Sequence, residues 1–186
     1  MRLLPLFVSL AGFFWLFGGS ILAQEASPMY ESWAKQKVGA SVKLKSSSEM
    51  MGQKSELETN LTLVELTPER AIVEAKMTVH VMGQTMEQPA QKLEIPAQVT
   101  TEQPTDPIEA MKKMGAEVTE LPGEDVTVAG KSYSCKVFQT SVKQGENTVT
   151  GKTWTSTEMP GMLVRMESTT EGAMASKTVV EVVEVK

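Results

Sequence analysis

The chain has 186 residues, of which 41% are hydrophobic and 22% charged, and its 18 Lys and Arg against 23 Asp and Glu give a formal net charge of -5. This length provides for one domain of ordinary size. A single Cys excludes a disulfide framework within the chain, and a single His excludes a metal site built on several histidines. The acidic balance and an aromatic content of 5% argue against nucleic acid as a partner.

The N-terminal residues predict a secretory signal peptide. Arg2 gives a basic start, residues 3–22 are almost wholly apolar, and the small Ala23 suits the position before a cleavage site. We therefore expect removal of residues 1–23, which leaves residues 24–186 as a single β-rich domain in the periplasm or secreted. Ala26 is a second possible cleavage position. A retained membrane anchor is the alternative, because about twenty apolar residues can span a bilayer; no second apolar run of that length follows.

A short helix is predicted over residues 28–36. Ser27 can cap the helix, Pro28 fits the first helical position, and Met29 and Trp33 lie four residues apart on one face.

Long antiparallel strands are predicted wherever apolar and polar residues alternate. The alternation runs through residues 38–45, 57–63 and 71–81. Turn sequences that contain Gly or Pro separate such segments at regular spacing, which is typical of hairpins. The helices are too few and too short to provide the crossovers of a parallel sheet.

A second helix is predicted over residues 107–114. Asp106 can act as its N-cap and Pro107 fits its first position. Ile108 and Met111 share one face, so we expect the helix to lie against the sheet or to close one end of it.

The second half of the chain completes the predicted sheet with residues 125–129, 132–143, 148–156, 162–170 and 174–185. The last segment has valines on both faces, as expected of a strand covered on both sides. The fold class is therefore mainly β (α+β), with a single curved antiparallel sheet or half-barrel of roughly nine strands and two short helices. The pattern does not decide between an open sheet and a closed barrel.

The single thiol and the single imidazole do not form a recognisable catalytic group. Cys135 alternates in phase with Tyr133 and Val137, which is the pattern of a small apolar side chain that faces a core. A catalytic cysteine needs a base, and His80 is expected on the polar face of its strand. We therefore expect that the protein is not an enzyme and that the Cys135 thiol has a structural role. The alternative for Cys135 is a disulfide with another molecule.

Methionine is common, with 13 residues in the chain. Thioethers suit Cu(I) and imidazole accommodates either oxidation state of copper, so His80, Met82 and Met86 are weak candidates for a copper site. A second group of the same kind is Met159, Met162 and Met166. The alternative is that methionines fill a core that has few aromatic residues. We expect no cofactor.

The most distinctive local sequences are Gly130-Lys-Ser-Tyr-Ser-Cys135-Lys-Val-Phe and Trp154-Thr-Ser-Thr-Glu-Met-Pro160-Gly161. A G-K-x-Y-x-C strand followed by a W-x-S-x-x-x-P-G turn resembles small secreted bacterial domains of unknown function. Over residues 28–186 the order of elements is similar to the lipoprotein-carrier (LolA-like) architecture, a curved antiparallel sheet that cups short helices. That resemblance implies an apolar concavity for an acyl chain or another hydrophobic ligand.

We therefore expect a non-catalytic exported protein that binds a hydrophobic ligand, either a lipid or a lipoprotein acyl chain, in the concave sheet. A sizeable apolar cavity is expected beneath the helix at 107–114. The alternative is a structural or protein-interaction module of the cell envelope with a filled core, and a Met/His copper-binding protein is the third hypothesis. The candidate ligand contacts are Met77, Met111, Met114, Trp154 and Met166.

Overall fold

A computed structural model describes residues 24–50, 52–81, 84–100, 107–113, 115–145, 147–172 and 175–186. Ten strands of this part of the chain form one antiparallel sheet, and β1 (Gln24–Ala26) pairs separately with β7 (Gln98–Thr100). The strands of the large sheet are β2 (Ser41–Met50), β3 (Gln53–Leu66), β4 (Arg70–Val81), β5 (Gln84–Glu87), β6 (Gln91–Pro96), β8 (Glu117–Val128), β9 (Lys131–Gln144), β10 (Asn147–Thr155), β11 (Leu163–Glu171) and β12 (Ser176–Val185).

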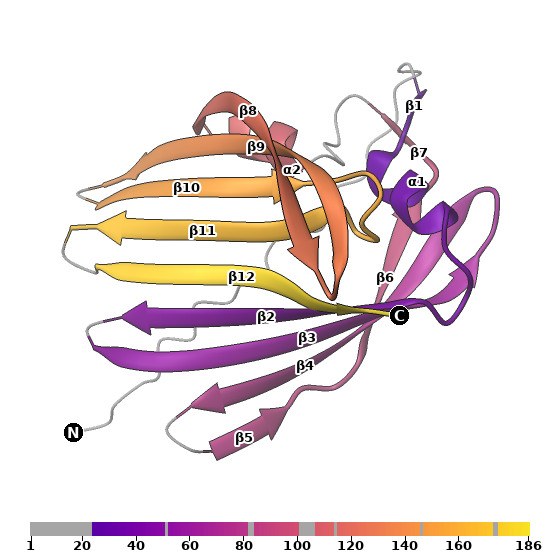
Figure 1. Ribbon diagram of the computed structural model, residues 1–186, viewed down its shortest axis with the longest axis horizontal. Helices are drawn as coiled ribbons and strands as arrows, with labels where there is room; N and C mark the ends of the chain where they lie inside the picture. Colours follow the sequence, from indigo (N-terminus) through magenta and orange to yellow (C-terminus); the bar gives the residue numbers. More distant parts are fainter. Residues whose placement is uncertain are drawn as a thin grey trace.

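The predicted mainly β fold is confirmed. The strand order is β5-β4-β3-β2-β12-β11-β10-β9-β8, and β6 also pairs with β4. Within the described residues β8 forms one edge, and β5 and β6 form the other, so the sheet stays open (Figure 1). The pairing of β2 with β12 joins the N-terminal and C-terminal halves of the chain into this one sheet.

Both predicted helices are present. In α1 (Pro28–Ala34) the Ser27 hydroxyl accepts a hydrogen bond from the Tyr30 amide at 3.2 Å, as the capping prediction requires. The Ser27 amide donates to the Ala97 carbonyl at 2.9 Å. The second helix, α2 (Pro107–Lys113), lies beside β8 and buries Ile108. Its predicted cap, Asp106, lies outside the described residues.

Alternation did not predict β5, β6 or the first part of β8. β8 contains Pro122 and Gly123, residues that normally interrupt a strand. The register with β9 shifts between Leu121 and Glu124, so this pair lies in a β-bulge of an edge strand, where a proline removes no hydrogen bond of the sheet.

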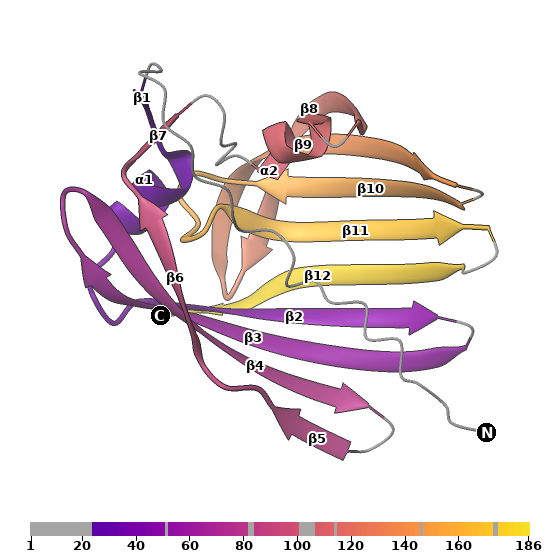
Figure 2. The ribbon, with the colours of Figure 1, turned by 180° about the vertical axis from the view of Figure 1, so that it is seen from behind.

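The two ends of the sheet differ in what covers them. In Figures 1 and 2 α1, the C-terminus and the connection after β10 lie at one end, which we call the core end. Strands β2, β4, β9 and β11 finish at the opposite end, which we call the turn end (Figure 1).

The hydrophobic core gathers at the core end around Trp33 of α1, which is 1% exposed. Its strand residues come from the starts of β2, β4, β9 and β11 and from the ends of β3, β10 and β12. They include Val42, Leu63, Ala71, Val73, Cys135, Val137, Trp154, Val164 and Val182.

The connection after β10 is fixed to α1. The Gly161 amide donates to the Ser32 hydroxyl at 3.0 Å, and the Lys35 ammonium donates to the Thr157 carbonyl at 3.1 Å. The Trp33 ring lies beside Gly161, whose φ of 78° favours glycine. The Pro-Gly turn predicted from the sequence therefore positions this connection against the helix.

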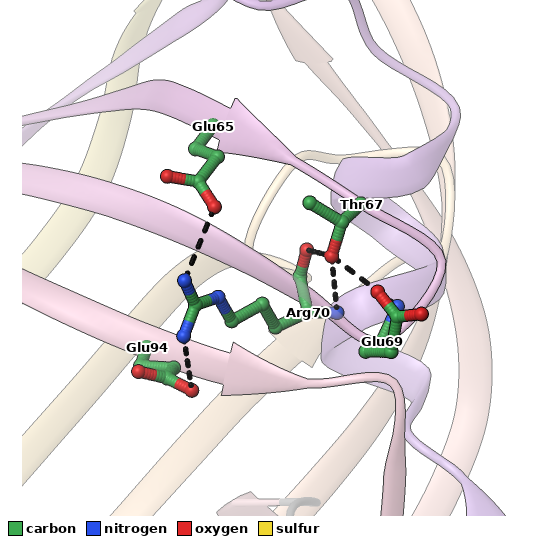
Figure 3. A network of polar contacts seen from close by, with 5 residues as sticks. All are labelled: Glu65, Thr67, Glu69, Arg70 and Glu94. Carbon is green, nitrogen blue, oxygen red and sulfur yellow. Dashed lines mark hydrogen bonds and ion pairs between the residues drawn. The ribbon is translucent and has the colours of Figure 1, made fainter.

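A polar network joins β3, β4 and β6 near the core end (Figure 3). The Arg70 guanidinium reaches the Glu65 and Glu94 carboxylates, each at 3.3 Å. The Thr67 hydroxyl accepts from the Arg70 amide at 3.2 Å, and the Thr67 carbonyl accepts from the Tyr30 hydroxyl at 2.6 Å. The turn between β3 and β4 is thereby connected to α1 as well as to β6.

The prediction that the last strand is covered on both sides is wrong. Val182 is buried, but its neighbour Val183 is 40% exposed. The register between β12 and β2 shifts between Val182 and Glu184, so Val183 is the extra residue of a β-bulge. A second such residue, Val64, lies where the register of β3 with β4 shifts and is 38% exposed.

Replacing Leu63 tests the position of the core. Leu63 is 0% exposed, so Leu63→Ala should lower the free energy of unfolding by about 2–5 kcal/mol. Val64→Ala is the matched control at the next residue and should change it by about 0.5 kcal/mol or less. Urea denaturation followed by circular dichroism gives both values, and equal effects would contradict the assigned core.

Candidate functional site

The sheet continues beyond its own core. In the turn-end half every described side chain is half-buried or exposed, on both faces of the sheet. This half comprises residues 46–50, 53–58, 77–81, 138–143, 147–152, 166–171 and 176–180. A sheet normally buries at least one face against a second layer, and among the described elements no second layer covers this half (Figures 1 and 2).

Along the border of this half, one face of the sheet carries a row of mostly apolar side chains that runs across the strands. Residues that pair directly in an antiparallel sheet share a face, and successive pairs connect eight residues from β5 to β9. They are Met86, Val79, Leu57, Ser46, Val180, Met166, Thr153 and Phe138, and we call them the apolar strip. All but Met86 and Thr153 are half-buried; Met86 is 41% exposed and Thr153 is buried.

The next row toward the turn end is rich in hydroxyl groups. Its members Ser55, Ser48, Thr178, Ser168 and Thr140 form what we call the hydroxyl row, with Gly151 between the last two. The Ser48 and Thr178 hydroxyls are hydrogen-bonded at 3.0 Å. A further row consists of Met50, Ser176, Thr170, Val149 and Val142.

The opposite face of the same strands carries the charges, and we call it the ionic face. Lys43 pairs with Glu58 at 2.7 Å, and Lys45 pairs with Glu56 at 3.0 Å. The hydrogen bond with Glu56 raises the pKa of Lys45, and the hydrogen bond with Lys43 lowers the pKa of Glu58. Such exposed pairs contribute little to stability, but they show that the paired charges of these strands lie on one face.

The other face of the turn-end half is therefore uncharged across the strip and the two rows beyond it. Burying a charge beneath a ligand is costly, whereas apolar groups and hydroxyls that bond each other lose little. An uncharged face that keeps half-exposed methionines and valines is therefore suited to contact with an apolar occupant.

Two of the predicted contact residues lie at this site. Met166 belongs to the apolar strip, where it pairs with Val180. Met77 is half-buried on the same face of β4, two residues from Val79, and lines a pocket of about 370 Å³ together with Glu87. Met111 is half-buried in α2 and is not paired with the strip, and Met114 lies outside the described residues.

Trp154 lies on the ionic face, because its neighbour Thr153 belongs to the apolar strip and side chains alternate along a strand. Its indole nitrogen donates to the Glu124 carboxylate at 2.8 Å. The Lys152 ammonium lies 4.6 Å and the Arg165 guanidinium 5.6 Å from the ring centroid. Trp154 thus connects β10 to the edge strand β8 and does not face the strip.

The copper candidates are not brought together. Val79 pairs with Met86 and His80 pairs with Thr85, so His80 and Met86 point to opposite faces of one hairpin. The His80 ring shares a hydrogen bond of 3.1 Å with the Thr85 hydroxyl. Met82 lies outside the described residues. Among the residues that the structure describes, no three His, Cys, Asp or Glu side chains form a group that could hold a metal ion.

Cys135 and His80 do not form a catalytic pair. Cys135 lies on β9 and His80 on β4, and the sheet places five strands between them. The Cys135 thiol is buried and donates to the Tyr133 carbonyl at 3.4 Å. Burial raises the pKa of this thiol, which disfavours the reactive thiolate. The second Met group is not a surface site either, because Met159 and Met162 are buried at the core end.

The cavity expected beneath the helix at 107–114 stays a prediction. A pocket of about 230 Å³ lies at the core end between Tyr133, Pro160 and Val185. Neither this pocket nor the one beside Met77 is lined by residues of α2. Within the described residues, neither helix has the length and apolar character needed to cross a membrane.

Most members of the apolar strip were missed by sequence reasoning. Leu57, Val79 and Phe138 each appear in an alternating segment, which gives the face within one strand but not the neighbour on the next. Only the register shows that they continue one another across the sheet.

Alkylation tests the structural role of Cys135. Because the thiol is buried and its pKa is raised, iodoacetamide at pH 8 should leave it unmodified in the folded protein and label it fully in urea. Mass spectrometry gives the extent of labelling. Rapid labelling of the folded chain, or a covalent dimer without reductant, would contradict a structural thiol.

Glu124→Gln should make the protein less stable at pH 7. The hydrogen bonds from Lys152 and from Trp154 lower the pKa of Glu124 below its ordinary value of 4.5. A lowered carboxyl pKa stabilises the folded state above that ordinary value, and this contribution is lost as the pH falls through the folded-state pKa. The gap in melting temperature between wild type and Glu124→Gln should therefore narrow below pH 4.5. Glu171→Gln, at an exposed position in β11, is the control and should leave the melting temperature at pH 7 nearly unchanged.

No protein-family model matches the chain, and a search of curated proteins finds no match. Solved structures do match. An exported-protein candidate with a YmcC-like fold from Bacteroides fragilis aligns at a TM-score of 0.44 and 12% identity, over 81% of this chain and 97% of that one. A lipoprotein candidate from Parabacteroides distasonis aligns at 0.45 and 14% identity, over 81% and 96% of the two chains.

A LolA superfamily protein from Nitrosomonas europaea also matches, at a TM-score of 0.24 and 8% identity, over 87% of this chain and 93% of that one. The matched structures thus include the family that the sequence resembles. At these TM-scores the matched structures say nothing about the function of this chain. Its function is inferred below from its own surface.

Proposed function

We propose that this is an exported, non-catalytic protein that binds a hydrophobic ligand, a lipid or a lipoprotein acyl chain, along the apolar strip. The observation that carries the proposal is the uncovered and uncharged face of the turn-end half, opposite a face that holds ion pairs. The extracytoplasmic location rests on the predicted signal peptide at residues 1–23.

The shape of the strip favours a long and narrow ligand. Its eight residues lie on eight neighbouring strands, so it extends over about 34 Å at about 4.8 Å per strand spacing. It is one side chain wide, between Leu44 and Met77 on the core-end side and the hydroxyl row on the other. An acyl chain laid across the strands could contact several members of the strip at once.

The expected affinity is moderate. Full burial of a Val, Leu, Met or Phe side chain contributes about 1.5–3 kcal/mol, and most of the six apolar members of the strip are already half-buried. About 1 kcal/mol from each would give about 6 kcal/mol before the costs of association, which favours reversible binding over permanent capture.

The rival function is a protein-interaction module, and the filled core favours it. Trp33, Leu63 and Val137 are at most 1% exposed, so the core end is already occupied by the protein's own side chains. In this alternative, a partner protein and not a lipid would cover the uncharged face of the turn-end half.

Val180→Lys and Val179→Lys form a matched pair that tests the proposal. Both valines are half-buried and adjacent, but Val180 lies between Ser46 and Met166 in the strip, whereas Val179 pairs with Glu167 on the ionic face. Val180→Lys should weaken binding of monopalmitoylglycerol at least about tenfold, a loss of about 1.4 kcal/mol. Val179→Lys should leave the affinity nearly unchanged, because its ammonium can remain in water.

Both variants are compared with the chain from residue 24 onward by native mass spectrometry, and their melting temperatures show that they are folded. Chain purified from its native host is then denatured to release any lipid that copurifies. Equal binding by the two variants, or binding of neither monopalmitoylglycerol nor palmitate by the folded wild type, would overturn the proposal. A copurifying protein whose binding is lost in Val180→Lys would favour the rival.

A further inference from the structure

The hydroxyl row indicates the chemistry of the polar head group of the ligand, whereas the apolar strip concerns only its acyl chain. It lies immediately beside the apolar strip, where the polar end of an amphiphile would extend if its chain occupied the strip. Ser55, Ser48, Thr178, Ser168 and Thr140 can each donate and accept hydrogen bonds. A head group that itself carries hydroxyls could exchange hydrogen bonds with this row in both directions.

A cation that could neutralise an anionic head group is absent from these rows within the described residues. Lys43, Lys45 and Arg165 lie on the other face, and each is within 3.0 Å of a glutamate. Lys152 also lies there and pairs with Glu124 at 2.8 Å. These four residues, which could bind a carboxylate or phosphate through charge, are thus separated from the strip by the sheet itself.

Two charged residues lie near one end of the strip, at the edge formed by β8 and β9. Glu120 pairs with Phe138 and extends the line of the strip onto β8, where a carboxylate repels an anion. Lys136 lies two residues from Phe138, on the core-end side of the strip and away from the hydroxyl row. Neither residue offers an anionic head group a partner beside the hydroxyl row.

From these observations we infer that the ligand is an amphiphile with an uncharged, hydroxyl-bearing head group, of which a monoacylglycerol is the simplest example. This inference rests on the proposed function, because the chain must occupy the strip for the head to reach the hydroxyl row. An ionised head group placed there loses hydration without gaining a charged partner, which costs more than transferring a neutral hydroxyl.

A matched pair of lipids tests the inference. Monopalmitoylglycerol and palmitate carry the same acyl chain, but palmitate is ionised at pH 8. The wild-type chain should bind monopalmitoylglycerol at least about tenfold more tightly than palmitate, with both measured by isothermal titration calorimetry below their aggregation concentrations.

Thr178→Lys places an ammonium in the hydroxyl row and should reverse this preference toward palmitate. Ser47→Lys places the same charge at an exposed position on the ionic face, where Ser47 pairs with Glu56, and should leave the preference unchanged. Because the two positions lie on neighbouring strands, a general effect of added positive charge would appear in both variants.

The outcomes separate this inference from the proposed function. Equal affinity for the two lipids, or a preference that Thr178→Lys does not shift, overturns the neutral head group but leaves lipid binding at the strip intact. Binding of neither lipid by the folded wild type overturns both. A dimer in analytical ultracentrifugation that Thr178→Lys dissociates and that excludes both lipids would also overturn both, because it assigns the face to a second copy of the chain.

Discussion

A sheet needs a second layer on at least one face. In the described structure the core end has one, and α2 lies beside the edge strand β8. There α1 places Trp33 between the ends of the strands, and the connection after β10 is hydrogen-bonded to the same helix. Seven residues of helix cannot cover ten strands. Burial is therefore concentrated at one end, and the strands continue beyond it without a covering element.

The β-bulges show how one short helix suffices for the core. The register shifts at Leu63–Glu65, Leu121–Glu124, Trp154–Thr155 and Val182–Glu184 all lie near the core end. Bulges bend strands and increase their twist, so the sheet coils around Trp33 where the shifts gather. In the turn-end half the registers of the paired strands run without interruption, which keeps the rows of side chains aligned across the strands.

This alignment connects stability with function. On the ionic face it places lysines opposite glutamates, and such exposed pairs serve solvation more than stability. On the other face the same alignment joins one residue from each of eight strands, six of them apolar, into the strip. Because the core is complete without the strip, the side chains of the strip can be substituted or covered by a ligand at little cost to the stability of the fold. This independence is what a reversible binding surface requires.

The sequence by itself determined both helices, most of the long strands and, within each of these strands, which side chains share a face. Alternation placed Val179 and Val180 on opposite faces of their strand, and Cys135 and Val137 on the same face of theirs. The Ser27-Pro28 cap defined the start of α1. These patterns could be read from the sequence because they depend only on local geometry. The tertiary structure decided which strands are neighbours, where the bulges interrupt the alternation, and that β5 and β6 join the edge. Pairing such as that of β2 with β12 joins segments over a hundred residues apart in the chain, and its register follows from packing of the whole sheet. The apolar strip exists only through that register, so no single segment could have shown it.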